Sequence, residues 1–125
     1  MTLSVNEWTF KLPMVKPLSL NDRMNYYAKA KAIKQVRDDV HVLCQATKVP
    51  KCERISVHLT WYPGPLVRRR DPLNLVATLK AVEDGVVQAK IVPDDTPQYV
   101  VSVMPTIGDK PVKVGELWVT IERLA

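Results

Sequence analysis

Apolar and polar residues alternate in two separate stretches of the chain, and this period of two predicts half-buried strands. In the first stretch Trp8, Phe10 and Leu12 are separated by polar residues, and Pro13 ends the run. In the second, residues 55–61, apolar side chains alternate with Ser, His and Thr. Each stretch is expected to turn one face toward a core.

Two other stretches repeat apolar residues at steps of three and four, which is typical of amphipathic helices. The first runs from Asn21, a suitable N-cap, to about Lys48. Its expected apolar stripe consists of Tyr26, Ala30, Ile33, Val36, Val40 and Leu43. The second runs from Pro72 to about Lys90, and Gly85 is expected to weaken it and to favour an early end. Its stripe consists of Leu75, Leu79, Val82 and Val86.

The remainder of the chain predicts a turn at residues 94–97, a buried strand within 99–104 and a last strand at 117–121. The order strand, helix, strand, helix, strand, strand predicts an α+β domain. We expect a small mixed or antiparallel sheet of about four strands with two helices packed on one face. At 125 residues the chain suffices for a single domain, residues 1–125, and not for two separate cores.

The distribution of charge along the chain indicates the type of binding partner. Eighteen Lys and Arg against thirteen Asp and Glu give a net charge of +5, and the basic residues cluster at 29–37 and 68–70. Clustering favours a polyanionic partner more than a basic balance alone does. The cations of the first helix either form a solvated surface or contact phosphates, and contact with phosphates would make affinity strongly salt dependent. They are Lys29, Lys31, Lys34 and Arg37.

The cysteines and histidines do not indicate a metal or catalytic site. Cys44 and Cys52 lack metal-ligand spacing. The pair allows a disulfide but does not require one, and reduced thiols in a cytoplasmic protein are expected. His41 and His58 have no partner spacing. No segment is long and apolar enough to span a bilayer, and the first residues do not resemble a secretory signal. We therefore expect a soluble intracellular protein with no membrane partner.

Candidate chemistry concentrates in residues 68–100, RRRDPLNLVATLKAVEDGVVQAKIVPDDTPQYV. Asp71 follows three arginines, and Asp94 and Asp95 return beyond the predicted helix. Carboxylates with waters and phosphate oxygens suit Mg²⁺, and arginine forks hold phosphates, so a metal-dependent nuclease site is one interpretation. The other is structural: Asp71 before Pro72 is typical of a helix start, and an isolated Asp pair is typical of a turn.

The same run resembles the signature of the RusA family of Holliday-junction resolvases, particularly the forms carried by bacteriophages. That signature is a basic run, Asp-x-Asp-Asn-Leu, a helix with a lysine and a later Asp, and a closing Asp-Asp pair. The upstream segment LSLNDRMNYYAKAKAIKQVR is similar to the family's N-terminal helix, so the resemblance covers about residues 17–100. It implies a homodimeric, Mg²⁺-dependent endonuclease of a bacterial or phage-infected cell that makes paired nicks in four-way DNA junctions.

The resemblance also implies roles for single residues. Asp71 and Asp95 match the first and last acids of the signature and would be catalytic metal ligands, while Lys80 matches the helix lysine and would lie near the scissile phosphate. Asp94 and Asp84 are further metal-ligand candidates. The candidate DNA-binding residues are Arg68, Arg69, Arg70, Lys29, Lys31, Lys34, Arg37 and Asn74.

One position departs from the signature. Leu73 stands where the second motif acid belongs, and leucine cannot bind a metal. This leaves three explanations: a natural loss of activity, a deliberate substitution, or a site that works with fewer acids. The alternative function is therefore a catalytically impaired or inactive homodimer that binds branched DNA. A further alternative is a basic structural or interaction protein with no nucleic-acid role, in which Asp71 only caps a helix.

Overall fold

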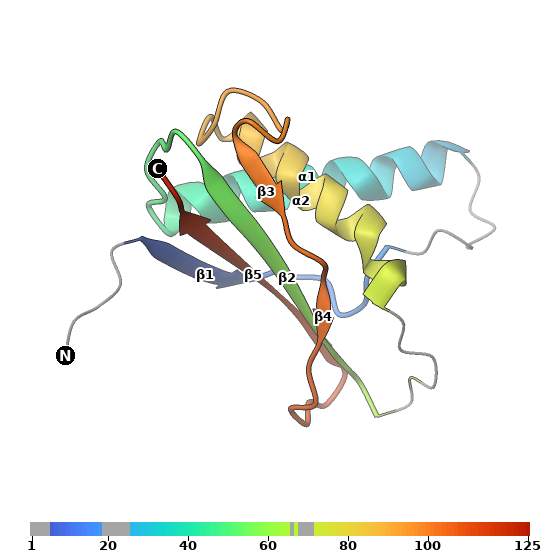
Figure 1. Ribbon diagram of the computed structural model, residues 1–125. Helices are drawn as coiled ribbons and strands as arrows, with labels where there is room; N and C mark the ends of the chain where they lie inside the picture. The colour runs from blue at the N-terminus through green and yellow to red at the C-terminus, as the bar shows by residue number, and fades with distance from the viewer. Residues whose placement is uncertain (1–5, 19–25, 66, 68–71) are drawn as a thin grey trace.

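A computed structural model describes residues 6–18, 26–65, 67 and 72–125, without the side chains of Leu73 and Asn74 (Figure 1). Within these residues five strands form one mixed sheet, accompanied by two α-helices. The elements are β1 Glu7–Lys11, α1 Tyr26–Ala46, β2 Ile55–Pro63, the 3₁₀ turn η1 Pro72–Leu75, α2 Val76–Gln88, β3 Val100–Ser102, β4 Thr106–Ile107 and β5 Gly115–Arg123. The predicted α+β fold is confirmed, with a sheet of five strands in place of about four.

The sheet is built around β2 and β5. Its strand order is β1-β5-β2-β3, and β4 also pairs with β2. β5 is antiparallel to both β1 and β2, whereas β3 and β4 run parallel to β2. Leu59 lies opposite Val119, and both are buried, as the alternation in each strand predicts. Because β2 and β3 are parallel, the chain must cross over between them, and α2 forms that crossover.

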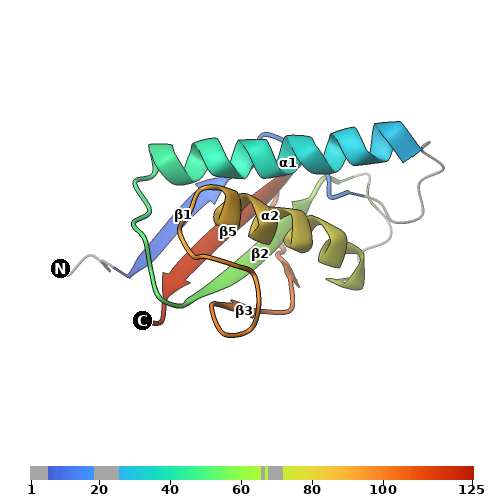
Figure 2. The same ribbon diagram turned by 90° about the horizontal axis from the view of Figure 1, so that it is seen from above.

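Both helices cover the same face of the sheet, as predicted (Figure 2). The second predicted helix begins at Pro72 as the 3₁₀ turn η1 and becomes α-helical only at Val76. Its predicted stripe is confirmed, since Leu75 of η1 and Leu79, Val82 and Val86 of α2 are buried in the common core. α1 contributes Val36, Val40 and Cys44 to that core, and burial raises the pKa of the Cys44 thiol to about 12. Cys44 is therefore a small core residue and no nucleophile at neutral pH.

The predicted stripe of α1 is wrong over its first turns. Tyr26 is 81% exposed and Ala30 is also exposed, although both fit the helical period. Full burial begins only at Val36, because α2 packs against α1 around Arg37 and Val40. The proposed N-cap, Asn21, lies outside the described residues.

Gly85 does not end α2, which continues to Gln88, so the expected early end is wrong. A Cβ atom built at Gly85 would lie 2.7 Å from the carbonyl oxygen of Arg37 and 2.7 Å from Cβ of Val40. Real Cβ atoms do not approach that closely. The glycine therefore serves the close contact between the two helices, which outweighs its low helix propensity.

The segment after α2 differs in part from expectation. Only Val100 of the predicted strand is fully buried, and Ser102 is exposed, because β3 lies at the edge of the sheet. The short strand β4 follows and was not predicted. Neither helix in the described part of the chain has the length and apolar content needed to cross a membrane.

Candidate active site

Lys80 and Asp84 lie one helical turn apart on α2, and the α2–β3 loop brings Asp95 to the same place. The Nζ atom of Lys80 donates a hydrogen bond to Oδ1 of Asp84 at 2.9 Å and another to Oδ2 of Asp95. Asp95 is 15 residues from Lys80 in sequence, so tertiary folding creates this contact. We call these three residues the acid–lysine cluster.

The charges of the cluster reinforce one another. The hydrogen bond from Lys80 lowers the pKa of Asp95, and the bonds to Asp95 and then Asp84 raise the pKa of Lys80. The side chains of Lys80, Asp84 and Asp95 are 58, 32 and 26% exposed, so a ligand in solvent can reach them. At neutral pH the cluster is therefore an accessible ammonium group between two carboxylates.

A third carboxyl group, Glu83, lies beneath the cluster and was not found from the sequence. It is buried, and it accepts a hydrogen bond from Oγ of Ser102 on β3. Burial raises the pKa of Glu83. The signal that could have found it is spacing, because Glu83 follows Leu79 by four residues and precedes Val86 by three, which places it beside the apolar stripe.

Asp94 has a different role from Asp95. Its Oδ1 atom accepts a hydrogen bond from the backbone N–H of Asp95 at 2.8 Å. The contact joins neighbouring residues of the α2–β3 loop. The turn predicted at residues 94–97 lies two residues later, because the backbone N–H of Tyr99 donates to the carbonyl oxygen of Thr96 at 2.9 Å.

The donor set of the cluster fits Mg²⁺ in type. Asp84 and Asp95 supply hard carboxylate oxygens, and Mg²⁺ commonly uses one or two carboxylates with waters and substrate phosphates. Among the described residues no group of three or more His, Cys, Asp or Glu side chains could hold a metal. The predicted first acid, Asp71, lies outside the described residues, as do Arg68, Arg69 and Arg70. The ammonium of Lys80 lies between the two carboxylates and would have to move aside for a metal.

The cations of α1 are not brought to the acid–lysine cluster. At about 100° per residue, Lys29, Lys31, Lys34 and Arg37 spread over an arc of about 200° and do not form one face. Lys34 is ion-paired with Asp38 at 2.8 Å. Figure 2 shows α2 between α1 and the loop that carries Asp95. Of the four α1 cations, Lys31 is exposed and is in no ion pair with any described residue, so it could contact a part of a ligand distant from the cluster.

Comparison of the chain with protein-family models finds no match, and comparison with curated proteins finds none either.

Proposed function

We propose that this chain is a RusA-type endonuclease that resolves four-way DNA junctions by paired, Mg²⁺-dependent nicks. The observation that carries the proposal is the convergence of Lys80, Asp84 and Asp95 from two segments of the chain at one accessible point. The resemblance of residues 68–100 to the RusA signature supports the same chemistry. The proposal includes a homodimer, because paired nicks need two sites, and the cytoplasm of a bacterial or phage-infected cell.

In this proposal Asp95 and Asp84, together with Asp71, hold Mg²⁺. When bound, the ion lowers the pKa of a coordinated water and neutralises charge on the scissile phosphate. Asp95 is ready for this role because its lowered pKa keeps it ionised. The hydrogen bonds to Asp95 and Asp84 raise the pKa of Lys80, so it is charged within the cluster. Its ammonium would turn from the carboxylates to a phosphate oxygen and stabilise negative charge there.

The remaining cations position the substrate. Arg68, Arg69 and Arg70 precede the first acid in sequence and would hold phosphates next to the scissile one with forked hydrogen bonds. Lys31 is exposed on α1 and would contact another part of the junction. Contacts of this kind read the path of the backbone and its deformability, so the shape of the junction selects the substrate.

A second candidate function is favoured by Leu73. A homodimer that binds branched DNA without cutting it needs the phosphate contacts and not the full set of metal ligands. Leu73 removes one carboxylate of the signature and leaves the cations in place.

One experiment separates the two candidates. An end-labelled four-way junction is incubated with Mg²⁺ and the unmodified chain, with Leu73→Asp or with Asp95→Asn. Paired nicks from the unmodified chain, abolished by Asp95→Asn, support the endonuclease. Cleavage by Leu73→Asp alone supports the non-cleaving binder, and failure to prefer the junction over a linear duplex contradicts both.

A further inference from the structure

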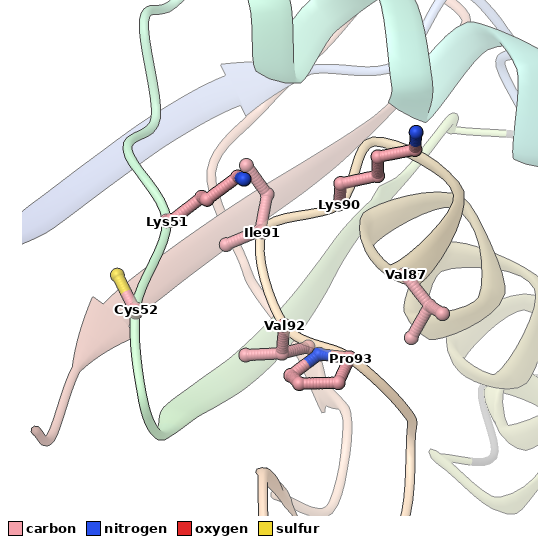
Figure 3. A pocket seen from close by; sticks show the side chains of 7 residues that line it. All are labelled: Lys51, Cys52, Val87, Lys90, Ile91, Val92 and Pro93. Atoms are coloured by element: carbon pink, nitrogen blue, oxygen red, sulfur yellow. The ribbon is translucent and has the colours of Figure 1, made fainter.

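A pocket of about 370 Å³ opens between the α1–β2 connection and the end of α2 (Figure 3). In Figure 3 Lys51 and Lys90 flank Ile91 at one end of the pocket, and Val92 and Pro93 lie at the other. Ile91 and Val92 are buried, so the floor is apolar, whereas both lysines are exposed. We call this the lysine pocket.

The lysine pocket lies close to the cluster along two segments of the chain. Val87, which lines the pocket, follows Asp84 by three residues on α2, a distance of about 4.5 Å along the helix axis. Pro93, which also lines the pocket, precedes Asp95 by two residues in the α2–β3 loop. A ligand longer than one nucleotide could therefore contact both the cluster and the pocket.

A second pocket, of about 500 Å³, extends the same groove. It shares Cys52 and Pro93 with the lysine pocket and adds Arg54 and Tyr99. Glu53 is the one acid among the side chains that line the two pockets, against three cations. Neither Lys51 nor Lys90 forms an ion pair with any residue that the structure describes. Their charge is thus available to an anionic ligand.

We infer that the lysine pocket binds the phosphodiester backbone of the DNA strand whose neighbouring phosphate lies at the acid–lysine cluster. A strand carries one phosphate per about 3.4 Å of helix axis, so a phosphate a few positions from the scissile one could contact Lys51 and Lys90. The apolar floor suits the sugar between two phosphates. The inference rests on the proposed function and adds a binding subsite to it.

The test measures binding of the full chain to a fluorescent four-way junction without divalent metal, so that no strand is cut. The variant is Lys51→Ala with Lys90→Ala. The matched control is Lys110→Ala with Lys113→Ala, which removes the same charge from the β4–β5 connection at the other end of β2 (Figure 1). Circular dichroism of both variants confirms that they are folded.

We expect the lysine-pocket variant to bind the junction on the order of tenfold more weakly at low salt. The slope of log affinity against log salt should fall by about 1 to 2, while the control changes affinity less than twofold. A junction with single neutral methylphosphonates, scanned along one strand, should lose affinity for the unmodified chain at one or two positions. The lysine-pocket variant should be insensitive to the same substitutions.

Two results would overturn the inference while leaving the proposed function intact. One is junction binding by the unmodified chain that both double variants weaken equally. The other is saturable binding of free phosphate or adenosine monophosphate, detected by shifts of the Val87 and Ile91 methyl resonances, without displacement by the junction. If the unmodified chain shows no preference for the junction over duplex, both the inference and the proposed function fail.

Discussion

The two helices contain the same local pair, a lysine followed four residues later by an aspartate, and they use it differently. On α1 Lys34 meets Asp38 at 2.8 Å, and on α2 Lys80 meets Asp84 at 2.9 Å. Asp38 accepts one further hydrogen bond, from the neutral amide of Gln88. Lys80 instead meets a second carboxylate, that of Asp95, which comes from outside the helix.

An isolated helical ion pair of this kind stabilises a helix by a few tenths of a kcal/mol. Neither pair is therefore needed for folding, and the local sequence does not separate them. The α2 pair differs in its surroundings. It contacts Asp95, which is distant in sequence, and the residue before Asp84 on the helix, Glu83, is buried and accepts a hydrogen bond from Ser102. The α1 pair is a matched control for the α2 pair.

The largest expected effect is on cleavage. Lys80→Met should lower the cleavage rate at least 100-fold in whichever form cuts, the unmodified chain or Leu73→Asp. A positioned cation that stabilises developing charge is worth a factor of about 10² to 10³. Lys34→Met should leave the rate within about twofold, since a lone helical ion pair is worth only a few tenths of a kcal/mol. Single-turnover cleavage of a labelled junction measures both, and equal losses would contradict a special role for Lys80.

The next effect is on stability and tests the contact between the helices. Gly85→Ala should lower the free energy of unfolding by about 1 to 3 kcal/mol, because the new methyl group meets the backbone of Arg37. Urea denaturation measures the change. Mg²⁺ binding should be unchanged in the folded variant, because the cluster faces away from α1. A stable Gly85→Ala protein would show that the helices can separate at little cost.

A smaller effect is expected on metal affinity. Asp95→Asn should weaken Mg²⁺ binding about tenfold, which corresponds to about 1.4 kcal/mol, because an amide oxygen replaces a carboxylate. Asp38→Asn removes the same charge from α1 and should leave the affinity unchanged. Isothermal titration calorimetry measures both variants. The metal assignment is wrong if the two titrations agree.

The smallest effect is a dependence of stability on pH. Burial raises the pKa of Glu83 in the folded chain. Above this raised pKa the charged carboxylate destabilises the folded state. The destabilisation disappears as the pH falls toward about 4.3, the ordinary pKa of a glutamate. Glu83→Gln should therefore raise the melting temperature by a few degrees at pH 7 and by less near pH 4.5. Scanning calorimetry at the two pH values measures this difference.

Two carboxyl groups with lowered pKa values should change stability with pH in the opposite direction to Glu83. The pKa of Glu116 is lowered, first by the hydrogen bond from Trp118. The pKa of Asp95 is lowered by Lys80. Each stabilises the fold above its ordinary pKa, and that contribution is lost as the pH falls through the folded value. Glu116→Gln should thus lower the melting temperature at pH 7. A higher melting temperature would show that the Glu116 carboxylate does not stabilise the fold.

The sequence predicted the parts of the fold that depend on local periodicity. The stripe predicted for the second helix was correct at every position, because all four residues are buried in the one core. The stripe of α1 failed at Tyr26 because the helical period continues beyond the region that α2 covers. Gly85 was misjudged because its partner, the backbone of Arg37, lies on another helix and leaves no local signal.

In the candidate site, too, the sequence predicted the local contact and not the contacts that depend on tertiary structure. The pairing of Lys80 with Asp84 follows from their spacing in a helix. The contact with Asp95 depends on the length and path of a loop, and the burial of Glu83 depends on β3 lying across it. The resemblance to a known signature singled out Asp95. It did not single out Lys51 and Lys90, which are not among the signature's named residues although the resemblance extends over both.

The position of β5 has a consequence for synthesis on the ribosome. β5 lies between β1 and β2 and pairs with both, although about 50 residues separate it from β2 along the chain. At about 5 to 20 residues per second, several seconds pass between the emergence of β2 and that of β5. During this interval β1 and β2 have apolar faces and unpaired edges, which are prone to aggregation. The sheet can therefore form only after β5 has been synthesised. Slowing translation before residue 115 should lower the yield of folded protein.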